Sequence, residues 1–353
     1  MTGNAGVWER LAAAGIVGGT APPAVDEQGP WYVAAMLGVA AWLSALFLLA
    51  FVGIALSDLL RSVTAALVIG ALVCAAAIAL LRAAGNHVFA TQLGIAASLA
   101  GQALVVYGVL EGGVRNPVAW LAFAVFEAIL VAAAPQQAHR VLATLAAATA
   151  VRMALGTVHA GALFPAVLAG AFVAAQGATP ARLLRDPVWA PVSGGLALAL
   201  LLVIPSALVD ELLFVTRRSA PLASFPAWAG TVAVAAVFVV SIGRLLREAG
   251  IAWRSRAGAW ALAAGVLVAV AAWPVPVVVV ALIVLLEAFA AGRRTLAGVA
   301  IAALLAALAY HYHTLQVPLL AKAGALAATG IVLLGARFLL PYARAGGPEA
   351  DRA

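Results

Sequence analysis

Charged residues are scarce in this sequence, and their scarcity decides its class. Only 9% of the 353 residues are charged and 66% are hydrophobic, with a mean hydropathy of +1.11, whereas a soluble domain carries about a quarter charged residues. The short alternating strands of an outer-membrane barrel are absent too, so helices must satisfy the backbone in lipid. We therefore predict an all-α, polytopic membrane protein with about 12 transmembrane helices and no separate soluble domain.

Cysteine is nearly absent from the sequence, and the signatures of soluble enzymes are absent. Cys74 is the single cysteine and lies in an apolar run, so it can form no internal disulfide and we expect a small core residue. The sequence contains no Walker loop, HExxH, GxSxG or dinucleotide fingerprint. We therefore predict no cofactor, no metal centre and no enzymatic activity, although a membrane enzyme that acts on lipids could lack all of these signatures.

Lysine is also nearly absent. Lys322 is the only lysine, and the other cationic residues are arginines. In a soluble protein the net charge of +7 would suggest a nucleic-acid partner. Here the cations flank apolar segments, where they set topology in the lipid bilayer, so no nucleic-acid partner is predicted. With a cytoplasmic amino terminus, all but six of the 20 cations fall on the inside, and both termini are predicted to be cytoplasmic. The six exceptions are Arg61, Arg115, Arg152, Arg217, Arg218 and Lys322.

Apolar runs divide the chain into a cytoplasmic segment and linker over residues 1–30, a transmembrane helical domain over 31–340 and a cytoplasmic tail over 341–353. Polar, glycine-containing or proline-containing turns separate the spans of the middle part. The predicted spans are Trp31–Leu56, Val63–Leu81, Val88–Val109, Val118–Ala134, Val141–Leu155, Val158–Ala175, Val192–Val209, Ala227–Ile242, Ala257–Trp273, Val275–Ala291, Thr295–Leu308 and Leu319–Leu340.

Several short motifs resemble one family. They are Pro30–Val33 running into Trp42–Phe51, then Leu99–Leu104, and finally Leu319–Lys322 followed by Thr329 and Gly330. Together they resemble the bacterial membrane proteins of domain-of-unknown-function family 4401, which are often encoded beside a membrane protein named for a GDYXXLXY motif. The resemblance implies a multi-pass protein of the bacterial inner membrane, and it carries no activity over to this chain.

Two ionisable residues are predicted to lie deep in the bilayer, where each costs about 3 kcal/mol or more without a partner. Glu127 follows Pro117 by ten residues, which is about 15 Å along a helix. With a turn at His139 and Arg140, an antiparallel hairpin brings Arg152 to the same depth. We expect Glu127 and Arg152 to pair, directly or through water; alternatively, a buried pair only fixes the register of the helices.

Glu287 repeats this spacing, eleven residues after Pro276. The repetition suggests a weak 6+6 duplication with its break near residues 177–191, as in transporters built from parallel repeats. Gln102 ends a stripe of small and polar residues at helical spacing, which serves either close helix packing or a cavity that faces Glu127. Gln102, Glu127, Arg152 and Glu287 form the candidate intramembrane site.

A second, weaker group is predicted at the outer interface. It comprises Asp210, Glu211, Tyr310, His311, Tyr312, His313 and Lys322. Two histidines two residues apart on a helix point in different directions and cannot share a metal ion, whereas in an extended turn they could. Membrane-interface anchoring by the tyrosines and the lysine explains the group better than a metal site.

Three functions are open on the sequence. The first is a secondary carrier or permease-like protein, with coupling to protons as one form of it. In that form Glu127 and Glu287 are protonatable, Arg152 is the counter-charge and Gln102 lines the path. The second is a non-catalytic membrane subunit that packs against another membrane protein or a second copy of the chain. The third, a lipid-modifying enzyme, rests only on the histidines and tyrosines, because the other polar residues are scattered along the sequence. A cavity that contains Glu127, Arg152 and Glu287 would favour the carrier.

Overall fold

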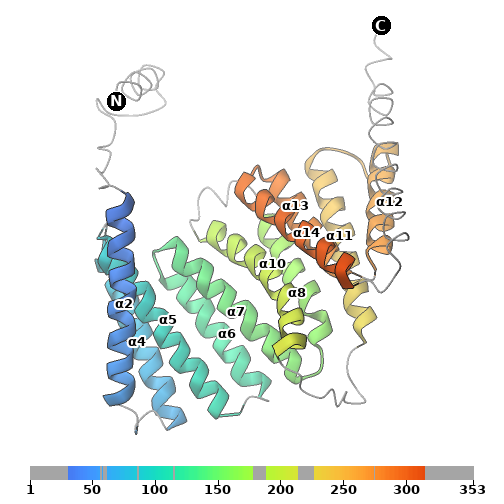
Figure 1. Ribbon diagram of the computed structural model, residues 1–353. Helices are drawn as coiled ribbons and strands as arrows, with labels where there is room; N and C mark the ends of the chain where they lie inside the picture. Colours follow the sequence, from blue (N-terminus) through green and yellow to red (C-terminus); the bar gives the residue numbers. More distant parts are fainter. Residues whose placement is uncertain are drawn as a thin grey trace, which may run out of the picture. The chain divides into compact units, whose positions relative to one another are not determined.

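Helices account for every regular element in the part of the chain that the structure describes (Figure 1). The computed structural model describes residues 31–55, 58, 62–85, 87–113, 116–177, 188–213, 226–273 and 275–314. Within these ranges the predicted all-α class is confirmed. The predicted amino-terminal segment, the twelfth span and the carboxy-terminal tail lie outside the described residues.

Each of the eleven spans predicted before residue 315 coincides with a described helix. The helices are α2 (Trp31–Ala55), α4 (Val63–Ala83), α5 (Val88–Glu111), α6 (Pro117–Ala133), α7 (Gln137–Thr157), the short 3-10 helix η1 (Gly161–Leu163), α8 (Phe164–Gly177), α10 (Trp189–Leu213), α11 (Ala227–Glu248), α12 (Arg256–Ala271), α13 (Pro276–Ala290) and α14 (Arg294–Thr314).

Caps explain where several of these helices begin. The side chains of Ser62, Asn116 and Ser255 accept hydrogen bonds from backbone N–H groups in the first turns of α4, α6 and α12. Pro117 and Pro276 stand at the first positions of α6 and α13, where proline loses no helical hydrogen bond. The predicted sixth span is shorter than expected at its start, because a turn with His159 at a φ of 59° and η1 precede α8.

Some of the helices are suited to a membrane. Val63–Ala83, Val88–Glu111 and Trp228–Glu248 are long and apolar enough to cross one, and most other described helices contain shorter apolar stretches. These features are compatible with a membrane protein. The count of twelve spans and the orientation of the termini stay predictions.

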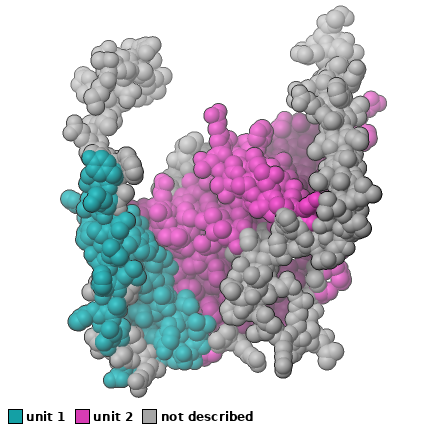
Figure 2. Space-filling view, viewed as in Figure 1, with its two compact units in different colours: residues 1–111 teal, residues 112–353 magenta. Residues whose placement is uncertain are grey.

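The chain divides into two compact units, Met1–Glu111 and Gly112–Ala353 (Figure 2). In unit 1, α5 packs against both α2 and α4. The contact of α4 with α5 leaves no room for a side chain at Gly101, where a Cβ would lie 2.7 Å from the carbonyl oxygen of Gly70. Close helix packing is therefore one role of the small-residue stripe predicted on α5.

Unit 2 contains the helices from α6 to α14. Its core lies where α8, α10, α11 and α13 meet and includes Phe172, Leu200, Val234 and Ile283, all 1% exposed or less. Helix α13 lies against α8, α10, α11 and α14, and α7 against α6 and α10. The predicted duplication, with its break inside this unit, stays a prediction.

Candidate functional site

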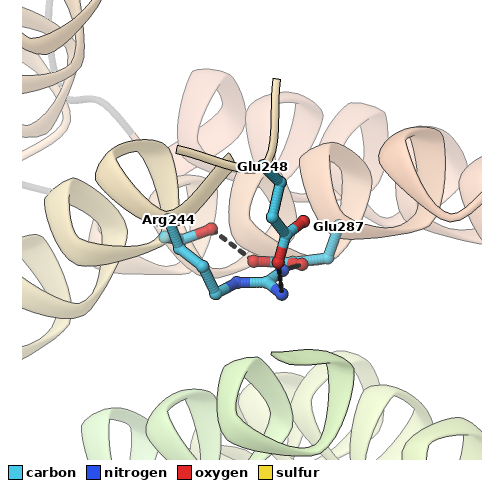
Figure 3. A network of polar contacts seen from close by, with 4 residues as sticks. Arg244, Glu248 and Glu287 are labelled. Carbon is cyan, nitrogen blue, oxygen red and sulfur yellow. Dashed lines mark hydrogen bonds and ion pairs between the residues drawn. The ribbon is translucent and has the colours of Figure 1, made fainter. Parts of the chain in front are cut away.

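Glu287 accepts two side-chain interactions at the end of α13 (Figure 3). The hydroxyl of Ser241 donates a hydrogen bond of 2.6 Å to its Oε1, and Nη2 of Arg244 forms an ion pair with its Oε2. Nη1 of Arg244 also lies 2.8 Å from Oε1 of Glu248. We call Ser241, Arg244, Glu248 and Glu287 the Glu287 network.

Helical spacing positions this network. Ser241, Arg244 and Glu248 follow one another at steps of three and four on α11, so they share one face of the helix. That face lies against the last turn of α13, where Glu287 is 1% exposed and Ser241 is fully buried. A Cβ at Gly177, the last residue of α8, would approach Nη1 of Arg244 to 3.4 Å. The ends of three helices therefore meet at one guanidinium.

A cavity of about 320 Å³ lies elsewhere in unit 2. Its walls come from α7, η1, α8, α10, α11 and α13 and are mostly apolar. The half-buried side chains of Arg152 and Thr231 supply its charged and hydroxyl groups. We call this space the Arg152 cavity.

The Arg152 cavity and the Glu287 network occupy opposite ends of the same two helices. Thr231 in the cavity wall precedes Ser241 by ten residues on α11, which is about 15 Å along the axis. Val280 precedes Glu287 by seven residues on α13, or about 10 Å. The buried core residues Phe238 and Val284 fall between these levels. Along α11 and α13, the Arg152 cavity thus lies toward one end and the Glu287 network toward the other.

The predicted direct pair of Glu127 and Arg152 is not formed. Glu127 is fully buried on α6, and neither of its carboxylate oxygens has a hydrogen-bond partner among the residues that the structure describes. The reason is the position of the turn. Pro135 forces Ala134 into an extended conformation, so the chain turns at residues 134–136 and not at His139. Arg152 then lies about nine residues beyond the level of Glu127, or about 13 Å along α7.

The three residues of the candidate intramembrane site that belong to unit 2 are therefore not brought together as predicted. Of the three in unit 2, only Arg152 lines the Arg152 cavity, whereas Glu287 belongs to the Glu287 network. Gln102 belongs to unit 1, where its Nε2 donates a hydrogen bond of 3.3 Å to Oγ of Ser98. The role that the carrier hypothesis gave to Glu127 has no geometric support in these contacts, and the role of Gln102 opposite Glu127 stays a prediction.

The outer-interface group is described only in part. Tyr310, His311, Tyr312 and His313 fall within α14, and Asp210 and Glu211 within α10. Except for Tyr312, which is half-buried, the side chains of these residues lie outside the structure's description, as does Lys322. Among the described residues, no group of three His, Cys, Asp or Glu side chains could hold a metal ion.

Sequence reasoning missed Ser241, Arg244 and Glu248. It counted Arg244 only among the cations predicted to lie on the inside, although the three residues share one helical face. A second polar contact in unit 2, between Arg293 and Ser193, was not predicted either. Arg293 directly precedes α14 and follows Glu287 by six residues. It donates a hydrogen bond of 2.5 Å to Ser193 in the first turns of α10.

Comparison with known proteins gives one match. The family described as Domain of unknown function (DUF4401) matches residues 30–343. No curated protein and no solved structure matches the chain. Because the match covers most of the sequence, the chain belongs to this family, Domain of unknown function (DUF4401).

Proposed function

We propose that this protein is a secondary carrier or permease-like protein, with unit 2 as the substrate-binding part. It spans the bacterial inner membrane with about 12 helices and has both termini in the cytoplasm. The apolar helices and the asymmetric distribution of arginines support this placement. No catalytic role is assigned.

One observation carries the proposal: α11 and α13 line a cavity toward one end and hold a charged network at the other. A carrier must present its site to one side of the membrane while the other side is closed. In this arrangement the Arg152 cavity is the binding site, and the Glu287 network closes the path toward the cytoplasm. Breaking the network lets α11 and α13 separate at that end.

The Arg152 cavity indicates the class of substrate. Its volume of about 320 Å³ falls in the range of small-molecule sites, which are mostly apolar with a few oriented polar groups. The guanidinium of Arg152 favours a negative charge, and the hydroxyl of Thr231 can donate or accept a hydrogen bond. We therefore propose a small organic anion with an apolar body.

Protons are the coupling ion in this proposal. Glu287 is the buried partner of Arg244, and a proton bound to its carboxylate removes the charge that holds the guanidinium. Opening of the cytoplasmic end then follows proton binding. Glu287 thereby takes the coupling role that the sequence had divided between two glutamates.

Thiol accessibility tests the proposal without knowledge of the substrate. The only native thiol, Cys74, is fully buried and can be replaced by alanine. Single cysteines are then placed at Thr231, in the Arg152 cavity, and at Ala288, which is fully buried beside Glu287. Labelling with a membrane-impermeant reagent is measured from each side of sealed vesicles.

Glu287→Gln is expected to raise cytoplasmic labelling at position 288 several-fold and to lower outside labelling at position 231, because an open inner end closes the outer one. Arg247→Gln is the matched control, since Arg247 is exposed on the same turn of α11 as the network. Unchanged labelling at both positions would overturn the carrier and leave the non-catalytic membrane subunit.

A further inference from the structure

A second open space lies at the same end of unit 2 as the Glu287 network. It is a groove of about 470 Å³ formed mainly by α10 and α14. Its rim is polar, with Arg293, Arg294 and Thr295, and its walls are apolar, with Leu198, Leu201 and Leu296 among them. We call it the Arg293 groove. It shares no wall residue with the Arg152 cavity.

Arg293 is held in the rim by a buried partner. Its Nη1 donates to the hydroxyl of Ser193, which is fully buried on α10. A guanidinium carries five N–H donors in a rigid fork, and within the described residues the bond to Ser193 uses one of them. Arg293 lies in the turn before α14, and burial lowers its pKa.

The two arginines have no acidic partner among the described residues. The nearest buried carboxylate in sequence, Glu287, is engaged by Arg244 and Ser241. A partly desolvated cation without a counter-charge is unfavourable, and an anion that binds both guanidinium groups would remove that cost. The rim is therefore complementary to a negatively charged group.

The walls of the groove suit a hydrocarbon chain. Leu198 and Leu201 stand one turn apart on α10, and Leu296 and Val299 do the same on α14. From Gly194 at the rim to Leu201 the groove follows seven residues of α10, which is about 10 Å. A free phosphate would leave these apolar walls uncovered, whereas an acyl chain would cover them.

We propose that the Arg293 groove binds one anionic phospholipid, with the phosphate between Arg293 and Arg294 and one acyl chain along α10 and α14. The charge distribution predicts that the end of unit 2 with the Arg293 groove faces the cytoplasm. A basic pocket between helices on that side suits an anionic headgroup. The site is independent of the proposed transport function.

Lipid binding can be measured on the full-length protein in detergent. Native mass spectrometry gives the fraction of protein that carries one added phosphatidylglycerol or one phosphatidylcholine of matched acyl chains. We expect phosphatidylglycerol to be retained preferentially. Arg294→Gln, at an exposed position, should weaken its binding about fivefold, and adding Arg293→Gln should weaken it further by a similar factor. Arg256→Gln is the control, because it removes an exposed arginine from the start of another helix.

A second pair of variants tests the apolar walls without touching the arginines. Val299 and Ile301 are exposed on α14 to 44% and 46%, but only Val299 lines the groove. Val299→Trp should lower phosphatidylglycerol binding severalfold, and Ile301→Trp should not. The proposal would be overturned if phosphatidylcholine were retained as well as phosphatidylglycerol, or if Arg256→Gln weakened phosphatidylglycerol binding as much as Arg294→Gln. Displacement of the lipid by millimolar inorganic phosphate would also overturn it, in favour of a free phosphate site.

Discussion

The hydroxyl of Ser241 donates a 2.6 Å hydrogen bond to Oε1 of Glu287, and this bond ties α11 to α13 across 46 residues of chain. Both side chains are buried. The bond occupies one carboxylate oxygen while Arg244 engages the other, so the position of Glu287 is fixed from two sides. This double contact distinguishes Glu287 from Glu127, whose carboxylate is also buried but has no hydrogen-bond partner among the described residues.

Ser241→Ala should destabilise unit 2. The substitution leaves Oε1 of Glu287 buried without its donor, which costs about 1 to 3 kcal/mol. Thermal unfolding in detergent, followed by circular dichroism, should show a lower midpoint. Thr149→Ala is the matched control, because the hydroxyl of Thr149 is exposed and only donates to the carbonyl of Leu145 one turn earlier. An equal shift in both variants would show that the Ser241 bond contributes nothing specific.

Arg244→Gln and Glu287→Gln should be strongly non-additive. Removing one partner of a buried ion pair costs about 3 to 5 kcal/mol, because the other charge stays buried alone. The double variant removes both charges and should be less destabilised than the sum of the single variants. The free energies of unfolding of the three variants give the coupling energy, with Arg247→Gln as the exposed control. Simple additivity would mean that the two residues do not interact.

The sequence predicted the helices well and their mutual register poorly. Long apolar runs, together with prolines such as Pro117 and Pro276 at helix starts, determine where helices form. The depth of Glu127 relative to Arg152 depends instead on the centre of one turn. When the turn is centred at Pro135 and not at His139, the residue of α7 that lies level with Glu127 moves toward the start of α7 by about twice the displacement of the turn. Arg152 is then about 13 Å away from that level.

The Glu287 network shows a different limit of sequence reasoning. The spacing of Ser241, Arg244 and Glu248 indicates a polar face on α11 by itself. Which helix covers that face depends on the packing of segments far apart in the chain, and no pattern within α11 identifies α13. The sequence therefore shows Glu287 and the polar face of α11 separately, and only the structure shows that they form one network.

Glu127→Met should stabilise the protein or leave its stability unchanged. Because neither oxygen of Glu127 has a hydrogen-bond partner among the described residues, the substitution removes the cost of burying a carboxyl and loses no contact of that kind. Methionine has a similar length and adapts to its surroundings. The unfolding midpoint should stay or rise, whereas Glu287→Met should lower it. A drop of more than about 1 kcal/mol for Glu127→Met would reveal a partner such as bound water.

Gly101→Ala should weaken the packing of α4 against α5. The added Cβ would lie 2.6 Å from Sγ of Cys74, 2.7 Å from the carbonyl oxygen of Gly70 and 2.9 Å from the backbone nitrogen of Cys74, so backbone as well as a side chain must move. Overpacking of this kind costs about 1 to 3 kcal/mol, which should lower the unfolding midpoint. Gly170→Ala is the control, because no atom lies within 4 Å of its added Cβ and alanine favours the helix by up to about 1 kcal/mol. If Gly101→Ala is as stable as Gly170→Ala, the close approach of α4 and α5 at Gly101 is wrong.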